Sequence, residues 1–362
     1  MKKGLAFVLS FVLIFTVVAL VACDSQPGGN HFSEVNLKNS ETRTEFVNTL
    51  AEKADAKKLF GDPSKEGWSL GLQENSKSKL GLNLTLTPAE GDGKYTANGN
   101  VEVTQSFKAM FKRTSDNLDF KGSLSIGAKG NVGLSDNICE LIGEETNALV
   151  KKLLANFNYR VDAYVDNDVA LVSISDSIYG NLPESVTDAL GSNKIKIALN
   201  STNVATFAEE LSALEDETDS VEAVINSIID NFIVPYKISV SVAHFNGYAV
   251  KFTATKESIL AILGATPSAT ASSVEDDTIA KFLSDDTKLE LTFRVDRNGR
   301  FSSISMKSNF KLNLYLDIPD MGKITGSVSL SGTSELKNAD VAITKPNEKD
   351  YTEFSGFEHS ED

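Results

Sequence analysis

The sequence predicts an α+β fold: a large, curved, antiparallel β-sheet, shaped like a half-barrel, with amphipathic helices packed on its concave side. Three observations support this fold class. Apolar and polar residues alternate with period two over unusually long stretches, which indicates half-buried strands. Turn sequences such as Asn246-Gly247 and Asn298-Gly299 lie between these stretches and favour hairpins. Apolar stripes with helical spacing separate some of the hairpins.

The strands are expected to be long. Leucines alternate with polar residues over 80–86, and the alternation resumes over 95–111 and over 118–128. Each of the last two segments exceeds the five or six residues of a typical strand, which implies a large sheet. Hairpins follow over 159–175, 238–254 and 289–306, with a last strand pair over 310–318 and 324–330.

Helical spacing interrupts the strands in several places. The clearest apolar stripe runs from Val221 to Phe232 and is closed by Pro235, which cannot continue a helix. Gly264 is a plausible residue for ending another helix. The expected helices cover 138–154, 204–211, 221–232, 259–263 and 274–283.

The N-terminus resembles a bacterial lipoprotein signal. Lys2 and Lys3 precede an uncharged, strongly apolar run that ends in Leu20-Val21-Ala22-Cys23. This ending is similar to a lipobox, and the resemblance implies that residues 1–22 are removed and that Cys23 carries a lipid anchor. The protein is then expected outside the cytoplasm, anchored to the cell membrane or the outer surface. A membrane-spanning helix with a chance cysteine is the alternative, because the run is just long enough to cross a bilayer.

Composition divides the rest of the chain into three parts. Residues 23–69 are expected to comprise the lipidated cysteine and a flexible tether that holds the domain off the membrane. A single β-rich domain follows over 70–345, and 346–362 form a polar tail. The alternative is a two-lobed arrangement that breaks near 265–275, where small residues predominate.

The charge and the cysteines restrict the partners. The chain has 35 basic and 50 acidic residues, a formal net charge of −15. Nucleic acid is therefore not an expected partner, because phosphate binding needs clustered Lys and Arg. Once Cys23 is lipidated only Cys139 remains, so no intramolecular disulfide is expected, and Cys139 is interpreted as a small buried residue.

No motif in the sequence indicates catalysis, so the protein is not expected to be an enzyme or to use a cofactor or a metal. His31 and His359 lie near the ends of the chain, and His244, beside Asn246-Gly247, is interpreted as structural. There is no nucleophile elbow, phosphate-binding loop or paired-histidine zinc motif. The acidic run over 209–219 is interpreted as a solvated connection between two helices.

The combination of lipobox, tether, long strands and intervening helices resembles the LolA-like half-barrel family of lipoprotein carriers. The resemblance rests on organisation over roughly 70–345. It implies an apolar cavity that binds a lipid or other hydrophobic ligand, besides the anchor's contact with the membrane. The alternative is a surface lipoprotein with a structural or adhesive role, in which the same side chains form a filled core. The residues expected to line or cap the cavity are Phe107, Phe111, Leu124, Ile126, Ile225, Ile229 and Phe232.

Overall fold

The computed structural model describes residues 31–53, 56–62, 65–89, 93–115, 117–136, 155–199, 221–265, 281–318 and 322–354. Several expectations concern residues outside these ranges. They are the signal segment with Cys23, the helix over 138–154 with Cys139, the helix over 204–211 with the acidic run, most of the helix over 274–283, and the last residues of the tail with His359.

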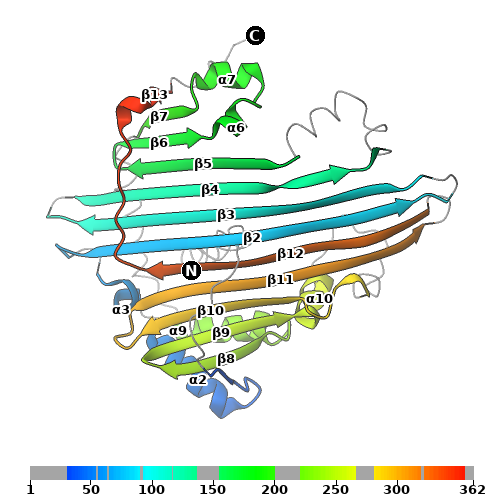
Figure 1. The fold of residues 1–362 in the computed structure, drawn as a ribbon. Helices are drawn as coiled ribbons and strands as arrows, with labels where there is room; N and C mark the ends of the chain where they lie inside the picture. The colour runs from blue at the N-terminus through cyan, green and yellow to red at the C-terminus, as the bar shows by residue number, and fades with distance from the viewer. Residues whose placement is uncertain are drawn as a thin grey trace, which may run out of the picture.

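The described strands form one open sheet of 13 strands in the order β1-β8-β9-β10-β11-β12-β2-β3-β4-β5-β6-β7-β13 (Figure 1). Neighbours are antiparallel except β13 and β7, which are parallel. The sheet ends at two-residue strands, β1 (Ser33–Glu34) and β13 (Thr352–Glu353), so it does not close on itself. The expected α+β class with a large, mainly antiparallel, half-barrel-like sheet is confirmed.

Five long strands occupy the middle of the sheet: β11 (Phe301–Ile318), β12 (Gly322–Asn338), β2 (Ser69–Thr87), β3 (Tyr95–Arg113) and β4 (Leu118–Leu134). Shorter strands flank them on both sides. These are β8 (Ser239–Phe245), β9 (Gly247–Thr255) and β10 (Lys288–Asp296) on one side, and β5 (Phe157–Asp166), β6 (Val169–Ile174) and β7 (Lys194–Ala198) on the other.

Side-chain hydrogen bonds close two of the expected hairpins. Asp166 Oδ1 accepts from the backbone N–H groups of Asp168 and Val169 between β5 and β6. Asp296 Oδ1 accepts in the same way from Asn298 and Arg300 between β10 and β11. These contacts are Asx turns, the local chemistry that makes Asp frequent in turns.

The hairpin at Asn246 is confirmed, but its turn is tighter than the expected two-residue type I′ turn. Only Asn246 separates β8 from β9, and Gly247 has a φ of +149°. A Cβ on Gly247 would lie 2.3 Å from the carbonyl oxygen of Val295. Glycine is therefore required here for the approach to β10 as well as for the backbone conformation.

The helices gather at the two ends of the sheet. Figure 1 shows α2 (Ser40–Lys53), α9 (Val221–Ile228) and α10 (Lys256–Ala265) beside β8 to β10. Helix α9 continues into a π-helical turn, η2 (Ile229–Ile233), so the expected helix over 221–232 is confirmed and slightly extended. The remaining short elements are α3 (Ala56–Phe60), α6 (Asp176–Tyr179), α7 (Glu184–Leu190) and η3 (Glu348–Asp350).

The expected flexible tether over 23–69 is wrong from residue 33 onward. Strand β1 pairs with β8, and helix α2 buries Phe46, Val47 and Ala51 in the main hydrophobic core. Only a few of the α2 side chains are apolar, so its composition resembles that of a linker. Those few are enough because they meet apolar side chains of the sheet and of α9.

Residues 346–354 of the expected polar tail are part of the folded structure. Strand β13 pairs with β7, and Ile343 and Tyr351 pack against a small core of Tyr164, Val169 and Leu171. The two-lobed alternative is also not observed. Strand β9 precedes residues 265–275 in the sequence and β10 follows them. The two strands pair along their whole length, from Lys288 opposite Thr255 to Asp296 opposite Gly247.

Candidate functional site

One face of the sheet is apolar across most of its width, because the register aligns the alternation of neighbouring strands. One row of cross-strand neighbours runs from β3 to β7 through Phe107, Leu124, Ala163, Val172 and Ile195. Side chains of paired residues point to the same face, so each row continues the apolar surface. A second row runs from β11 to β3 through Phe310, Leu330, Leu80 and Val101.

Helices cover this face at the β8 to β11 end. Ile225, Ile229 and Ile233 of α9 and η2 pack in the core formed with α2, α3 and the sheet. Ile229 has no exposed surface. The sheet side chains in this core are Val240, Tyr248, Val250, Val295, Phe301 and Leu336.

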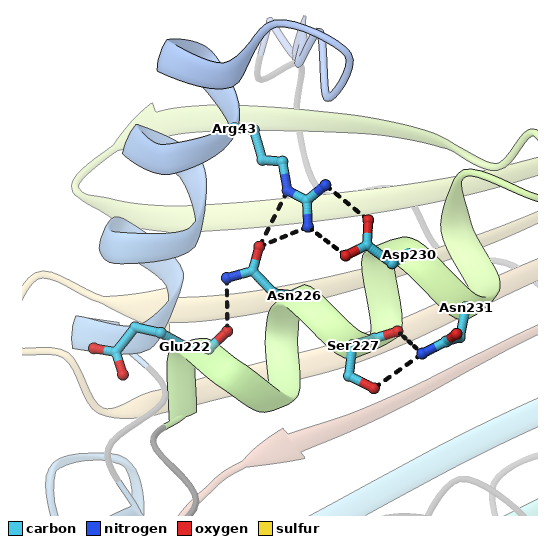
Figure 2. Close-up of polar contacts among 6 residues, drawn as sticks. All are labelled: Arg43, Glu222, Asn226, Ser227, Asp230 and Asn231. Carbon is cyan, nitrogen blue, oxygen red and sulfur yellow. Dashed lines mark hydrogen bonds and ion pairs between the residues drawn. The ribbon is translucent and has the colours of Figure 1, made fainter.

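A polar clamp joins the two covering helices (Figure 2). The Arg43 guanidinium of α2 donates to Asn226 Oδ1 at 2.8 and 3.1 Å and to both carboxylate oxygens of Asp230 at 2.7 and 2.8 Å. Arg43 holds the pKa of Asp230 below its usual value through these hydrogen bonds. The forked geometry fixes how α9 and η2 lie against α2.

Within the described part of the chain, the same face is only partly covered over the long middle strands. Leu80 of β2 is 42% exposed and Ile126 of β4 is 38% exposed. Phe107, Phe111 and Leu124 are half-buried on the same face. We call the apolar face of β12, β2, β3 and β4 the open stretch.

The seven expected cavity residues therefore fall into two groups. Phe107, Phe111, Leu124 and Ile126 share the open stretch, where Phe111 also lies 5.0 Å from Phe120 between ring centroids. Ile225, Ile229 and Phe232 belong to α9 and η2, which cover the sheet at β8 to β10, and four strands separate β9 from β3.

The α9 and η2 residues do not line a cavity. Ile225 and Ile229 pack as core, because α9 lies directly against the sheet. Phe232 lies at the surface, 48% exposed, with its ring 5.1 Å from that of Tyr236. The expectation that all seven residues surround one cavity is therefore not met.

A polar strip that was not expected from the sequence crosses the apolar face. Glu74, Ser76 and Ser78 occupy consecutive inward positions of β2, where leucines precede and follow them. Ser76 pairs with Ser334 of β12 and with Gln105 of β3. The signal was present as an interruption of the leucine alternation between Leu72 and Leu80, but only the register brings the strip together.

Glu74 is the centre of the strip. It is buried, its Oε1 accepts from Ser334 Oγ at 2.9 Å, and its Oε2 accepts from Gln105 Nε2 at 3.3 Å. Burial raises the pKa of Glu74, and the two hydrogen bonds offset only part of that rise. Ser76 and Ser78 are also buried, and within the described part of the chain their hydroxyls have no hydrogen-bond partner.

The opposite face of the middle strands is charged. Glu102 of β3 pairs with Lys77 of β2 at 2.7 Å and with Lys129 of β4 at 3.0 Å. These residues alternate with the apolar ones, as expected for a sheet with one face in water. The sheet is thus distinctly two-sided over the open stretch.

A hollow of about 630 Å³ with a mixed polar and aromatic lining lies where β5 begins and α6 packs beside it. Asn158, Arg160, Asp176 and Asn181 contribute to its lining, together with the stacked rings of Phe157 and Tyr159. None of the seven expected cavity residues lines it.

The described ranges contain neither a metal-binding cluster nor a membrane-spanning helix. Within them, no cluster of three or more His, Cys, Asp or Glu side chains is arranged to hold a metal ion. No helix there has the length and hydrophobicity needed to span a bilayer. His244 of β8 is exposed and lies 5.2 Å from the ring of Tyr248.

Comparison with known proteins yields little. No family model and no curated protein matches the chain. Among solved structures, the chain is similar to a beta-barrel-like protein of domain of unknown function DUF1849 from Brucella abortus, with 9% sequence identity. The match covers 73% of this chain and 98% of that one, with a TM-score of 0.15. At this TM-score we infer nothing about function from the likeness.

Proposed function

We propose that the protein is a lipid-anchored lipoprotein outside the cytoplasm that binds a lipid or other hydrophobic ligand on the open stretch. The observation that carries this proposal is the continuity of the apolar face beyond the helices that cover it. Ile126 remains substantially exposed beside half-buried Leu124 and Phe107, and Leu80 is exposed farther along the same face, opposite Val101. Large contiguous apolar surfaces are uncommon on soluble proteins and mark binding sites.

The binding step is physical and needs no catalysis. An acyl chain that lies along the open stretch loses contact with water, and so do the side chains beneath it. Each buried methylene contributes about 0.8 kcal/mol, so one acyl chain supplies enough free energy to offset the cost of association. The rows of β-strand side chains give a broad surface rather than a narrow pocket, which suits a flexible hydrocarbon.

Native mass spectrometry with lipid extraction tests the ligand. A chain of residues 24–362 keeps every described element, because the first of them is β1 at Ser33. We expect phospholipid or fatty acid to co-purify with it from a bacterial host. Ile126→Glu places a charge on the open stretch and is expected to remove the bound lipid.

Tyr315→Glu is the matched control. Tyr315 is 63% exposed and lies on the opposite face of β11, since it alternates with the inward Leu314. This variant is expected to keep the lipid, with circular dichroism showing both variants folded. A lipid-free wild-type chain that takes up no offered lipid would contradict the proposal.

The second candidate, an adhesive or structural role, is favoured by a different surface. Val221, Ile228, Phe232 and Val234 of α9, η2 and the following turn are each 40–48% exposed. An apolar patch of this kind suits a protein partner. A lipid-free chain that loses a partner after Phe232→Glu would support this role instead.

The anchor has its own test. We expect the full-length chain to incorporate an alkyne-labelled palmitate in a bacterial host, and Cys23→Ser to abolish incorporation. Cys139→Ser is the control and is expected to remain labelled. Equal labelling of the Cys23→Ser variant would exclude the lipobox assignment and leave the membrane-spanning alternative.

A further inference from the structure

The polar strip lies within a face that is otherwise built for hydrocarbon. Glu74, Ser76 and Ser78 are the only polar inward residues between Leu70 and Leu86 on β2. On one side of the strip the face continues into the helix-covered core through Leu336. On the other side of the strip, Leu80 and the leucines that follow it on β2 belong to the open stretch. An amphipathic ligand with its chain on the open stretch would therefore place its polar end at the strip.

We propose that the strip binds the hydroxyl-bearing headgroup of a neutral glycerolipid whose acyl chain lies on the open stretch. This assignment rests on the proposed function, and it specifies the class of ligand.

Two buried hydroxyls carry the assignment. Ser76 is 5% exposed and Ser78 is 4% exposed, and neither hydroxyl has a hydrogen-bond partner in the described ranges. Buried polar groups are normally hydrogen-bonded, because an unpaired one loses its contacts with water without replacement. A ligand that brings its own donors and acceptors would supply the missing partners.

The register shows how the strip is arranged. Ser76 lies between Ser334 and Gln105, the two residues that donate to Glu74. Ser78 lies opposite Gly332, which has no side chain to meet it from β12. The two hydroxyls thus belong to one continuous polar group with the Glu74 carboxyl.

The chemistry of the strip favours a neutral headgroup. Hydroxyls both donate and accept, so Ser76 and Ser78 match ligand hydroxyls and ester oxygens. A carboxylate headgroup would place a second acid beside buried Glu74, which accepts hydrogen bonds from the uncharged Ser334 and Gln105. Like charges held close together at a buried site are disfavoured. Glycerol hydroxyls avoid this repulsion.

The burial of the hydroxyls has a consequence for binding. A headgroup reaches them only after the atoms that cover them move aside. Binding is therefore expected to be slower than simple docking on an open surface, because it requires a conformational change.

The test compares two ligands that share an acyl chain and an ester. Monooleoylglycerol carries two hydroxyls, and methyl oleate carries none. The chain of residues 24–362 is expected to bind monooleoylglycerol about tenfold more tightly, as two modest hydrogen bonds would provide. Oleate is the charged comparison and is expected to bind more weakly than monooleoylglycerol.

The double variant Ser76→Ala/Ser78→Ala is expected to reduce the tenfold preference to about twofold or less while still binding methyl oleate. The matched control, Ser329→Ala/Ser331→Ala, changes two serines on the opposite face of β12 and is expected to keep the preference. Thermal unfolding of both variants checks that the fold is intact.

The outcomes separate the two proposals. Equal affinity for the two esters, or a preference that survives in the Ser76→Ala/Ser78→Ala variant, overturns the headgroup site while ligand binding stands. Failure of the wild-type chain to bind any of the three lipids overturns the proposed function, and the headgroup site with it.

Discussion

The two halves of the apolar face have the same sequence pattern and different surroundings. At the helix-covered end, Val240 alternates with the polar residues of β8 and is almost completely buried. Over the open stretch, Leu80 and Ile126 alternate in the same way and remain exposed. The difference comes from α2, α9 and η2, which pack on one half.

This contrast shows what period-two alternation means. It reports that two faces of a strand meet different surroundings, and it does not report what lies against the apolar one. The covered half contributes to the stability of the fold. The open half leaves apolar surface exposed, and we propose that a ligand binds there. The following experiments test this division, from the largest expected effect to the smallest.

The same substitution in the two halves gives the sharpest contrast. Ile229→Ala removes a fully buried side chain and is expected to lower the free energy of unfolding by about 2–5 kcal/mol. Ile126→Ala, on the open stretch, is expected to cost less than about 1 kcal/mol. Urea unfolding measures both. Equal losses would show that Ile126 is covered in solution and would remove the distinction.

The open stretch should still depend on its backbone packing. Gly326 of β12 has a φ of +147°, and a Cβ there would lie 2.0 Å from the carbonyl oxygen of Asn83. Gly326→Ala is therefore expected to cost about 1–3 kcal/mol in urea unfolding. Gly299→Ala is the control, since it shares a positive φ but meets nothing within 4 Å. A smaller loss of unfolding free energy for Gly326→Ala than for Gly299→Ala would mean that the backbone of β12 shifts at little cost to accommodate the added Cβ.

The polar strip should make stability depend on pH. Burial raises the pKa of Glu74 above its usual 4.5, so folding favours its protonated form. The stability contributed by protonated Glu74 is fully present below pH 4.5 and is lost as the pH rises through the raised value. The Glu74→Gln variant has no carboxyl to titrate at this position, so its stability does not fall with pH in this way.

Urea midpoints of the wild type and Glu74→Gln from pH 4.5 to 8 measure the effect. The midpoint of the variant, relative to wild type, is expected to increase with pH. A constant difference over this range would show that Glu74 is solvated like a surface carboxylate.

The smallest effect is expected at the far end of the sheet. Lys345 contacts Asp166 at 2.8 Å and Glu348 at 2.7 Å, and these contacts connect the C-terminal segment to β5. Lys345→Met is expected to speed hydrogen exchange in residues 341–354 and to leave the urea midpoint nearly unchanged, because partly exposed ion pairs contribute little. Unchanged hydrogen exchange would show that the packing of Ile343 and Tyr351, without the ion pairs of Lys345, holds the C-terminal segment in place.

Features set by neighbours in the chain were predictable. The hairpins at Asp166, Asn246 and Asp296 follow from local turn residues, and the α9 stripe follows from helical spacing. Helix α2 was missed because its few apolar residues reveal their role only when they meet the sheet. The C-terminal segment was missed for the same reason, since its residues add to a small core on β5 and β6.

The sequence by itself determined the strands, their two-sided character and most of the turns, because these depend on the order of residues over short distances. Tertiary structure decided which part of the apolar face is covered and which polar residues meet. Glu74 and Ser334 are 260 residues apart and share a hydrogen bond only because β2 and β12 pair in one register. A contact of that kind depends on the register of the whole sheet, which no short segment specifies.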